Sequence, residues 1–290
     1  MSTTRAHLLL FVAAALWGFG NVAQKTVLEH LDPISVVGLR CLIGAALVAP
    51  LMLTERGGPP GPGWIASLLR VGGLFAVAIL VQQVAYLGTT VSNASFLVNT
   101  ATVITPLAAW MMLRERPGGS VLAAAGLTLG GAFLMTGGVV RSIGAGDQAA
   151  LLSAILYALW MVELGRHALT YGRPFATAAA QFAGTAIVLL PAGALAGGIT
   201  EAAVRQALPE LLFLGVFSTA AAFGIQTAAQ RFTSASRAAI IVSAESVFGA
   251  AVAASVLGER LPATGLAGAA LILVAIALVA IRTPPAALPA

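Results

Sequence analysis

Ten long apolar segments follow one another along the chain, and they constrain its fold more than any other feature. Each has about 18 to 23 residues, enough for a helix to cross a hydrocarbon core about 30 Å thick. Only 9% of the 290 residues are charged, whereas a soluble domain carries about 25%, so the chain cannot cover a water-facing surface. We therefore predict an all-α integral membrane protein with helices at 7–28, 34–54, 66–88, 93–113, 119–140, 148–169, 174–196, 208–230, 236–257 and 262–282.

The sequence also repeats itself at a distance of about 140 residues. A shift of 144 positions carries Gln82 onto Gln226, and a shift of 143 carries Trp17 onto Trp160. The first apolar segment is therefore expected to belong to the repeat rather than to a cleaved signal peptide. Ordered matches with slowly drifting offsets indicate a duplicated unit; the others include Ala85–Ala229, Ser92–Ser236, Ala94–Ala238, Glu115–Glu259, Pro33–Pro174 and Pro50–Pro191.

Each repeat contains five helices, and because five is odd the second repeat must enter the membrane upside down. We expect two inverted five-helix repeats, residues 1–145 and 146–290, around a central cavity, as in many secondary transporters. With the N-terminus inside, ten arginines fall on the inner side and five cations on the outer side. This bias predicts an inner (cytoplasmic) membrane protein with both termini in the cytoplasm.

Six helices carry polar or aromatic side chains along one face, whereas the fifth and tenth carry almost none. A polar side chain in hydrocarbon is costly, so such faces should turn toward a cavity. Alternatively, these groups only bond packed helices together, and tryptophans favour the membrane interface. The candidate substrate-binding residues are Trp17, Asn21, Gln82, Tyr86, Ser95, Asn99, Tyr157, Trp160, Gln226, Ser243 and Glu245.

Two charged residues fall inside predicted helices and leave alternatives open. Glu245 lies about ten residues into the ninth helix, where a carboxylate must be protonated, paired or hydrated. It can carry protons, bind a substrate ammonium or be purely structural. Arg40 lies about two turns into the second helix; it can hold a substrate carboxylate, but we favour a side chain that extends outward to Glu29 or Asp32.

Four motifs resemble the EamA-type branch of the drug/metabolite transporter superfamily. They are LWGFGNVAQK (16–25), LDPISVVGLR (31–40), TPLAAWMMLRER (105–116) and SAESVFGAAVAASVLGERL (243–261). Ser246 stands where that family usually has a proline, which removes the usual source of a kink in the ninth helix. The resemblance implies a cavity lined by helices 1, 3, 4, 6, 8 and 9, with helices 5 and 10 peripheral. It also implies export of amino acids or related metabolites, as by the aromatic amino-acid exporters.

The function we predict is secondary transport of such metabolites by alternating access, with a channel or a non-catalytic assembly subunit as the alternative. Rings of charge typical of channels are not visible, and an intramembrane enzyme would need His or Asp at membrane depth. With one cysteine, no paired histidines and no GxxxxGK[ST] motif, we expect no metal, cofactor or ATP site. The expected partners are a small-molecule substrate and the lipid bilayer, with protons as a candidate coupling ion and no nucleic acid; the chain is expected as a monomer or weak homodimer.

Overall fold

The computed structural model describes residues 1–55, 61–137, 143–256 and 262–281, and within them all regular structure is helical. Nine helical stretches of this part are long and apolar enough to cross a membrane, and α6 (Gly119–Met135) is a shorter apolar helix. The all-α fold with ten crossings is thereby confirmed, and we number the crossings spans 1 to 10. Glu259 and the loop arginines Arg56, Arg141, Arg260 and Arg282 lie outside the described residues.

The helix ends agree with the predicted ones to within a few residues. Span 7 is followed by α9 (Glu201–Gln206), a short helix in the longest connection. The spans are built from α1 (Thr3–Thr26) with η1 (Val27–Glu29), α2 (Pro33–Val48) with η2 (Ala49–Thr54), α3 (Trp64–Gly88), α4 (Val91–Asn99) with α5 (Ala101–Leu113), α6, α7 (Ala145–Tyr171), α8 (Pro174–Leu195), α10 (Leu208–Leu212) with η3 (Phe213–Phe223), α11 (Gly224–Ala229) and η4 (Gln230–Phe232), α12 (Ala235–Val242) with α13 (Glu245–Val256), and α14 (Ala263–Ile281).

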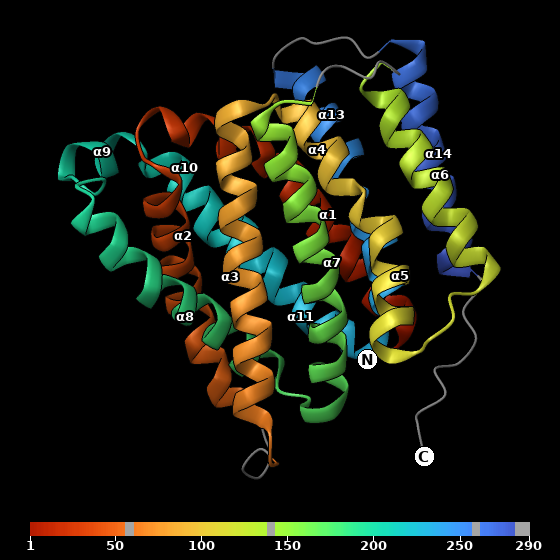
Figure 1. Cartoon of the computed structure of the whole chain (residues 1–290), viewed down its shortest axis with the longest axis horizontal. Helices are drawn as coiled ribbons and strands as arrows, with labels where there is room; N and C mark the ends of the chain where they lie inside the picture. Colours follow the sequence, from red (N-terminus) through yellow and green to blue (C-terminus); the bar gives the residue numbers. More distant parts are fainter. Residues whose placement is uncertain (56–60, 138–142, 257–261, 282–290) are drawn as a thin grey trace.

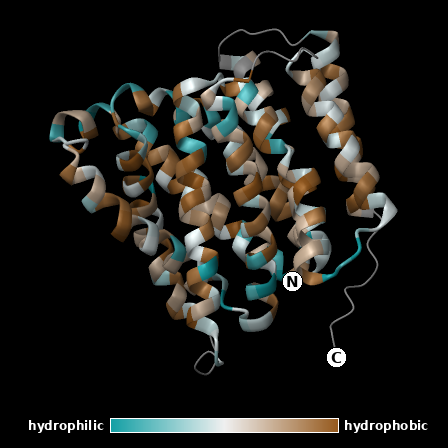
Figure 2. Ribbon diagram, in the orientation of Figure 1, coloured by the Kyte–Doolittle hydropathy of each residue, from teal (hydrophilic) through white to brown (hydrophobic). Residues whose placement is uncertain are grey.

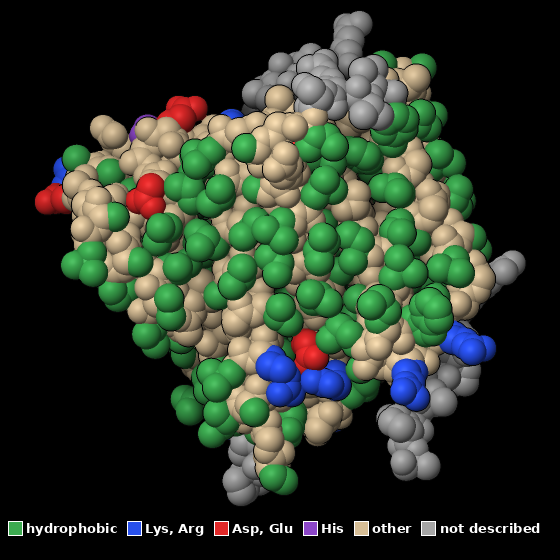
Figure 3. Space-filling model, in the orientation of Figure 1, with side chains coloured by type: hydrophobic (Ala, Val, Ile, Leu, Met, Phe, Trp, Pro, Cys, Tyr) green, Lys and Arg blue, Asp and Glu red, His purple; other side chains and the backbone are tan. Residues whose placement is uncertain are grey.

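The outer surface is apolar over the middle of the molecule. Figure 2 shows hydrophobic residues along the central part of the helices and polar residues toward their two ends. Large side chains such as Leu195 and Met111 are 90% and 80% exposed, and Figure 3 shows hydrophobic side chains spread over the visible face. An apolar surface this extensive would be unfavourable in water, so lipid is its natural solvent.

The two halves of the chain have helix N-caps and helix breaks at equivalent positions, 144 residues apart. Thr90 caps α4 by accepting a hydrogen bond from Asn93 N, and Ser234 caps α12 by accepting one from Arg237 N. Such caps satisfy backbone donors that a helix start leaves free. Spans 4 and 9 also both break in mid-course, at Thr100 and at 243–244.

Each break has a side chain that competes with the helix. The Thr100 hydroxyl donates to Leu97 O at 2.6 Å, and the Ser243 hydroxyl donates to Ile240 O at 2.5 Å. Hydroxyl groups that bond to the preceding turn bend or interrupt helices. Span 9 is therefore interrupted although the residue after Glu245 is Ser246 and not a proline.

The spans pack in pairs that map onto themselves when the two halves are exchanged. Spans 1 to 5 of the first half correspond to spans 6 to 10 of the second. Each of spans 2, 4 and 5 packs on its own counterpart, that is on span 7, 9 or 10. Span 3 packs on span 6, and in the same way its counterpart, span 8, packs on span 1. In Figure 1, α6 and α14 lie at one edge and α2 and α8 at the other. Spans 5 and 10 approach closely because Gly131 and Gly268 face each other: a Cβ added at Gly268 would lie 2.3 Å from Gly131 O. The core between these edges is formed by the remaining spans.

Candidate functional site

A cavity of about 70 Å³ lies in the core, between the two halves of the chain. One buried water needs roughly 10–15 Å³, so this space admits a few waters or a small polar group and must widen for a larger solute. Seven spans line it, because span 2 contributes in addition to the six that were expected. The lining residues are Trp17, Gln24, Arg40, Gln82, Val98, Asn99, Ala101, Thr102, Tyr157, Trp160, Met161, Ser218, Phe223, Gln226, Ala239, Val242 and Glu245.

Span 2 contributes Arg40, whose side chain is 1% exposed. Its Nε donates to Thr219 Oγ1 at 2.9 Å and its Nη2 to Ser218 Oγ at 2.6 Å, while Nη1 donates to Gln24 Oε1 at 3.3 Å. Among the described residues Arg40 makes no ion pair with a carboxylate. The expected outward extension of Arg40 to Glu29 or Asp32 is therefore wrong: the guanidinium points into the core.

The partners of Arg40 come from an unusually wound part of span 8. Residues 213–223 form the π-helical segment η3, and such segments are frequent at functional sites. Ser218 and Thr219 lie in this segment, and Ser218 O also accepts a hydrogen bond from Trp17 Nε1 at 3.0 Å. The local winding thus presents two hydroxyl groups to the guanidinium and ties span 1 to the same turn.

Glu245 enters the cavity from span 9, where it is the first residue of α13. The break in span 9 therefore places the carboxyl at a helix N-terminus, where the helix dipole favours a negative charge. Gly18 of span 1 packs against this turn, because a Cβ added there would lie 2.6 Å from Glu245 O. The close crossing of spans 1 and 9 holds the start of α13 at the cavity.

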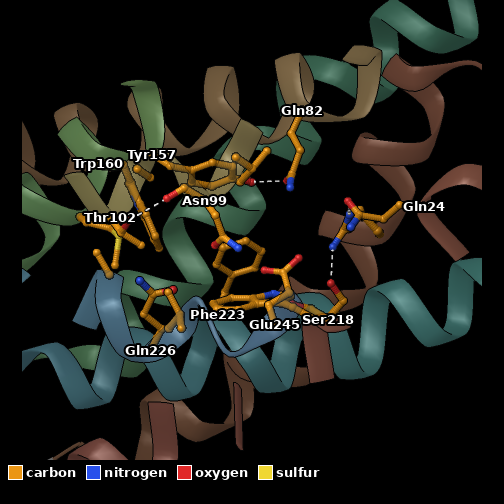
Figure 4. A pocket seen from close by; sticks show the side chains of 17 residues that line it. Gln24, Gln82, Asn99, Thr102, Tyr157, Trp160, Ser218, Phe223, Gln226 and Glu245 are labelled. Carbon is orange, nitrogen blue, oxygen red and sulfur yellow. Dashed lines mark hydrogen bonds between the residues drawn. The ribbon is translucent and has the colours of Figure 1, made fainter. Parts of the chain in front are cut away.

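Aromatic side chains form one wall of the cavity, with Phe223 at its centre. The Phe223 ring lies 4.7 Å from the ring of Trp17, 5.7 Å from that of Trp160 and 6.3 Å from that of Tyr157, measured between centroids. In Figure 4 the aromatic Tyr157, Trp160 and Phe223 lie around the same space as the polar Asn99 and Glu245. The cavity therefore offers an apolar wall next to a cation and a carboxyl.

The two glutamines at equivalent positions of the repeats both line this cavity. Gln82 Oε1 accepts a hydrogen bond from the Tyr157 hydroxyl at 2.8 Å. Gln226 Nε2 donates to Gln230 Oε1 at 3.4 Å, and Gln230 donates in turn to Met161 O at 3.0 Å. Each glutamine is thus held by a partner from its surroundings and presents its amide to the cavity from one half of the chain.

Four of the predicted residues do not line this cavity. Asn21 and Ser95 line a second space of about 460 Å³, which we call the vestibule. Tyr86 is buried behind them and donates its hydroxyl to Asn21 Oδ1 at 3.3 Å. Ser243 is fully buried and its hydroxyl is turned back to its own helix. The vestibule is reached from the end of the molecule at which α1 ends, because Lys25 and Thr26 also line it.

The sequence analysis did not name several of the lining residues, although helical spacing could have identified some of them. Phe223 lies four residues after Thr219 and three before Gln226, so helical spacing places it on the same face of span 8 as these two polar residues. Gln24 lies seven residues after Trp17 and therefore on the same face of span 1. Ser218 was not recognisable, because its position depends on the π-helical winding. Arg40 was considered as a ligand for a substrate carboxylate, but its inward direction depends on partners 178 and 179 residues away. Among the described residues, no group of three or more His, Cys, Asp or Glu could hold a metal ion.

Comparisons with known proteins agree with this architecture. The sequence matches the family described as the EamA-like transporter family over residues 4–137 and again over 144–281. Two proteins of Archaeoglobus fulgidus, each named an uncharacterized transporter, are 26% and 25% identical to it. The first match covers 89% of this chain and 91% of the relative, and the second covers 96% and 86%. A solved crystal structure superposes with a TM-score of 0.75 at 17% identity, covering 94% of this chain and 96% of its own, and so shares the fold.

Proposed function

The chain belongs to the EamA-like transporter family, and we propose that it exports amino acids or related small zwitterionic metabolites by alternating access. As a family member it is a multi-pass membrane transporter with a small-molecule substrate and a lipid environment. The finer proposal concerns the substrate and the movement: residues 1–145 and 146–290 act as two inverted halves that open the central cavity to one side of the membrane and then to the other.

The observation that supports this substrate is the pairing of Arg40 and Glu245 in one cavity. A guanidinium has five N–H donors, of which the hydrogen bonds to Gln24, Ser218 and Thr219 use three. The other two can bind a carboxylate in the bidentate manner that suits arginine. Because the cation is buried and has no ion pair within the part of the chain that the structure describes, an incoming carboxylate also offsets its unfavourable burial. Glu245 offers the matching negative charge for an ammonium group.

Ligand binding tests the substrate class without requiring transport. We expect α-amino acids to raise the melting temperature of the purified protein, because a ligand at 100 times its Kd adds about 2.7 kcal/mol of stability. The corresponding amines, which lack the carboxylate, and the corresponding acids, which lack the ammonium, should give little or no shift at the same concentration. Equal shifts from all three classes would contradict the assignment of Arg40 and Glu245 to the two ends of a zwitterion.

We also propose that both termini lie in the cytoplasm. An even number of spans brings the start of α1 and the end of α14 to the same end of the molecule (Figure 1), and Figure 3 shows Lys and Arg side chains gathered at that end. Since Arg40 lies in the core, it no longer counts among the five cations assigned to the other side. The remaining asymmetry favours the arginine-rich end as the cytoplasmic one.

A reporter fusion tests this orientation. Alkaline phosphatase folds only where its disulfides can form, and the cytoplasm keeps thiols reduced. Fused after Pro285, it should be inactive, while the same reporter fused to a chain truncated after Gly144, which follows span 5, should be active. The opposite pattern would place the termini outside.

A further inference from the structure

A hydrogen bond between spans 4 and 9 joins a side chain that lines the central cavity to one that lines the vestibule. Within span 1, Gln24 of the central cavity also donates to Asn21 Oδ1 of the vestibule at 3.1 Å. Asn99 lines the central cavity, Ser246 lines the vestibule, and Asn99 Nδ2 donates to Ser246 Oγ. Asn99 belongs to span 4 and Ser246 to span 9, so the contact also joins the two halves of the chain. The two residues therefore stand in the wall between the two spaces.

The wall is formed at the interruptions of both helices. Asn99 is the last residue of α4, directly before the break at Thr100, and Ser246 is the second residue of α13, directly after the break at 243–244. Discontinuous helices of this kind are where transporters move and bind. Because each break already lacks part of its backbone hydrogen bonding, α4 and α13 can tilt without unwinding a continuous helix. The contact thus joins two helical segments that each adjoin a break.

The vestibule is suited to a polar solute rather than to a lipid chain. Its lining includes Asn21, Lys25, Thr90, Ser92 and Ser95. Thr90, Asn21 and Ser95 have hydrogen-bond partners within the protein, and Lys25 donates to Thr89 O at 3.3 Å. The charge of Lys25 is nevertheless better solvated by water or a polar solute than by an acyl chain. Its volume of about 460 Å³ falls within the roughly 300–1,000 Å³ of small-molecule sites. The vestibule thus fits an antechamber of the central cavity on the substrate path.

We propose that the Asn99–Ser246 hydrogen bond is the gate between the central cavity and the vestibule, and that Ser246 is a gating residue of this chain. The proposal rests on the proposed transport by alternating access. Both side chains are short and neutral, and water can replace each as the partner of the other. A neutral hydrogen bond of this kind contributes little net free energy, so it can hold the wall closed and still break in every transport cycle.

Thiol labelling tests the gate separately from transport. Cys41 is the chain's single cysteine and is buried, so a Cys41→Ala background allows single reporters: Thr102→Cys in the central cavity and Ser92→Cys in the vestibule. Right-side-out and inside-out membrane vesicles are each treated with an impermeant methanethiosulfonate. The vesicle type in which Ser92→Cys is labelled exposes the vestibule to the reagent, and it is used for the comparison. We expect Ser246→Ala to raise the labelling rate of Thr102→Cys about threefold to tenfold, as loss of one neutral hydrogen bond implies. The rate for Ser92→Cys should stay the same.

The matched control is Ser255→Ala, which changes the same residue type on α13 at an exposed hydroxyl that bonds to Ala251 O. If Ser246→Ala does not fold, Asn99→Leu removes the same hydrogen bond from span 4 and must give the same increase. The gate is refuted if either gate variant leaves the Thr102→Cys rate at the level of the control, or if Thr102→Cys is never labelled from the vestibule side. Labelling needs no substrate, so failure of the amino-acid assignment would not be mistaken for failure of the gate.

Discussion

Replacing Arg40 with glutamine is expected to reduce amino-acid exchange in proteoliposomes at least about 30-fold, because truncating one partner of a buried, hydrogen-bonded charge pair costs about 2–5 kcal/mol. Glutamine can keep a hydrogen bond to Ser218 or Thr219, which limits the damage to the fold, but it cannot neutralise a substrate carboxylate. The binding assay should lose its amino-acid shift in parallel. Arg40→Lys should recover little, because a lysine ammonium lacks the planar fork that binds a carboxylate at two points.

The matched control for this change is Arg205→Gln in α9. Arg205 forms an exposed pair with Glu201, with side chains 79% and 87% exposed, and exposed pairs contribute about 0–1 kcal/mol. Exchange by this variant should equal that of the unmodified protein. If Arg40→Gln remained folded and exchanged amino acids normally, Arg40 would serve only to join span 2 to spans 1 and 8, and the substrate carboxylate would bind elsewhere.

Replacing Glu245 with glutamine is expected to weaken amino-acid binding by about tenfold or more, since a charge-assisted hydrogen bond contributes about 1.5–3 kcal/mol. Glutamine keeps the shape of the side chain and its place at the start of α13, but it removes the charge that meets an ammonium. The loss should appear as a higher substrate concentration for half-maximal exchange, with or without a pH gradient.

Two other outcomes for Glu245→Gln have clear meanings. Unchanged affinity with loss of acceleration by a pH gradient would show that Glu245 carries protons and does not bind the substrate. Unchanged affinity and unchanged acceleration would show a structural carboxyl. Glu201→Gln, which alters an exposed carboxylate of α9, is the control for the loss of one negative charge and should behave as the unmodified protein.

The number, place and kind of the helices could be predicted from the sequence because they depend on local composition. In lipid, the backbone N–H and C=O groups of a long apolar segment must form hydrogen bonds within the segment, and a helix achieves this whatever the segment packs against. The polar faces of spans 1, 3, 4, 6 and 8 were equally readable, since spacing alone brings Trp17 and Gln24, or Tyr157 and Trp160, to one side of a helix. Gln82 and Gln226 could be expected to face one space because they occupy equivalent positions in the two repeats.

The features that could not be predicted depend on contacts between distant spans. The sequence places Arg40 two turns into span 2, but only the packing of span 8 shows that its acceptors lie inward. Ser243 shares the polar face of span 9, yet its hydroxyl bonds to Ile240 O because the helix is interrupted there. Asn21 and Ser95 were assigned to one site with Asn99, whereas the wall at Asn99 and Ser246 divides the space into two. Periodicity indicates a face; it does not indicate where a cavity is closed.

Counterflow in proteoliposomes tests the central claim most directly, because only a carrier that alternates between two sides can exchange one substrate molecule for another. Vesicles are loaded with a high concentration of an unlabelled amino acid that shifts the melting temperature, and a trace of the labelled amino acid is added outside. The account predicts that labelled amino acid enters, transiently exceeds its outside concentration and then declines, and that the initial rate saturates. Entry that rises only to the outside concentration without saturating would show a channel and would contradict alternating access through this cavity.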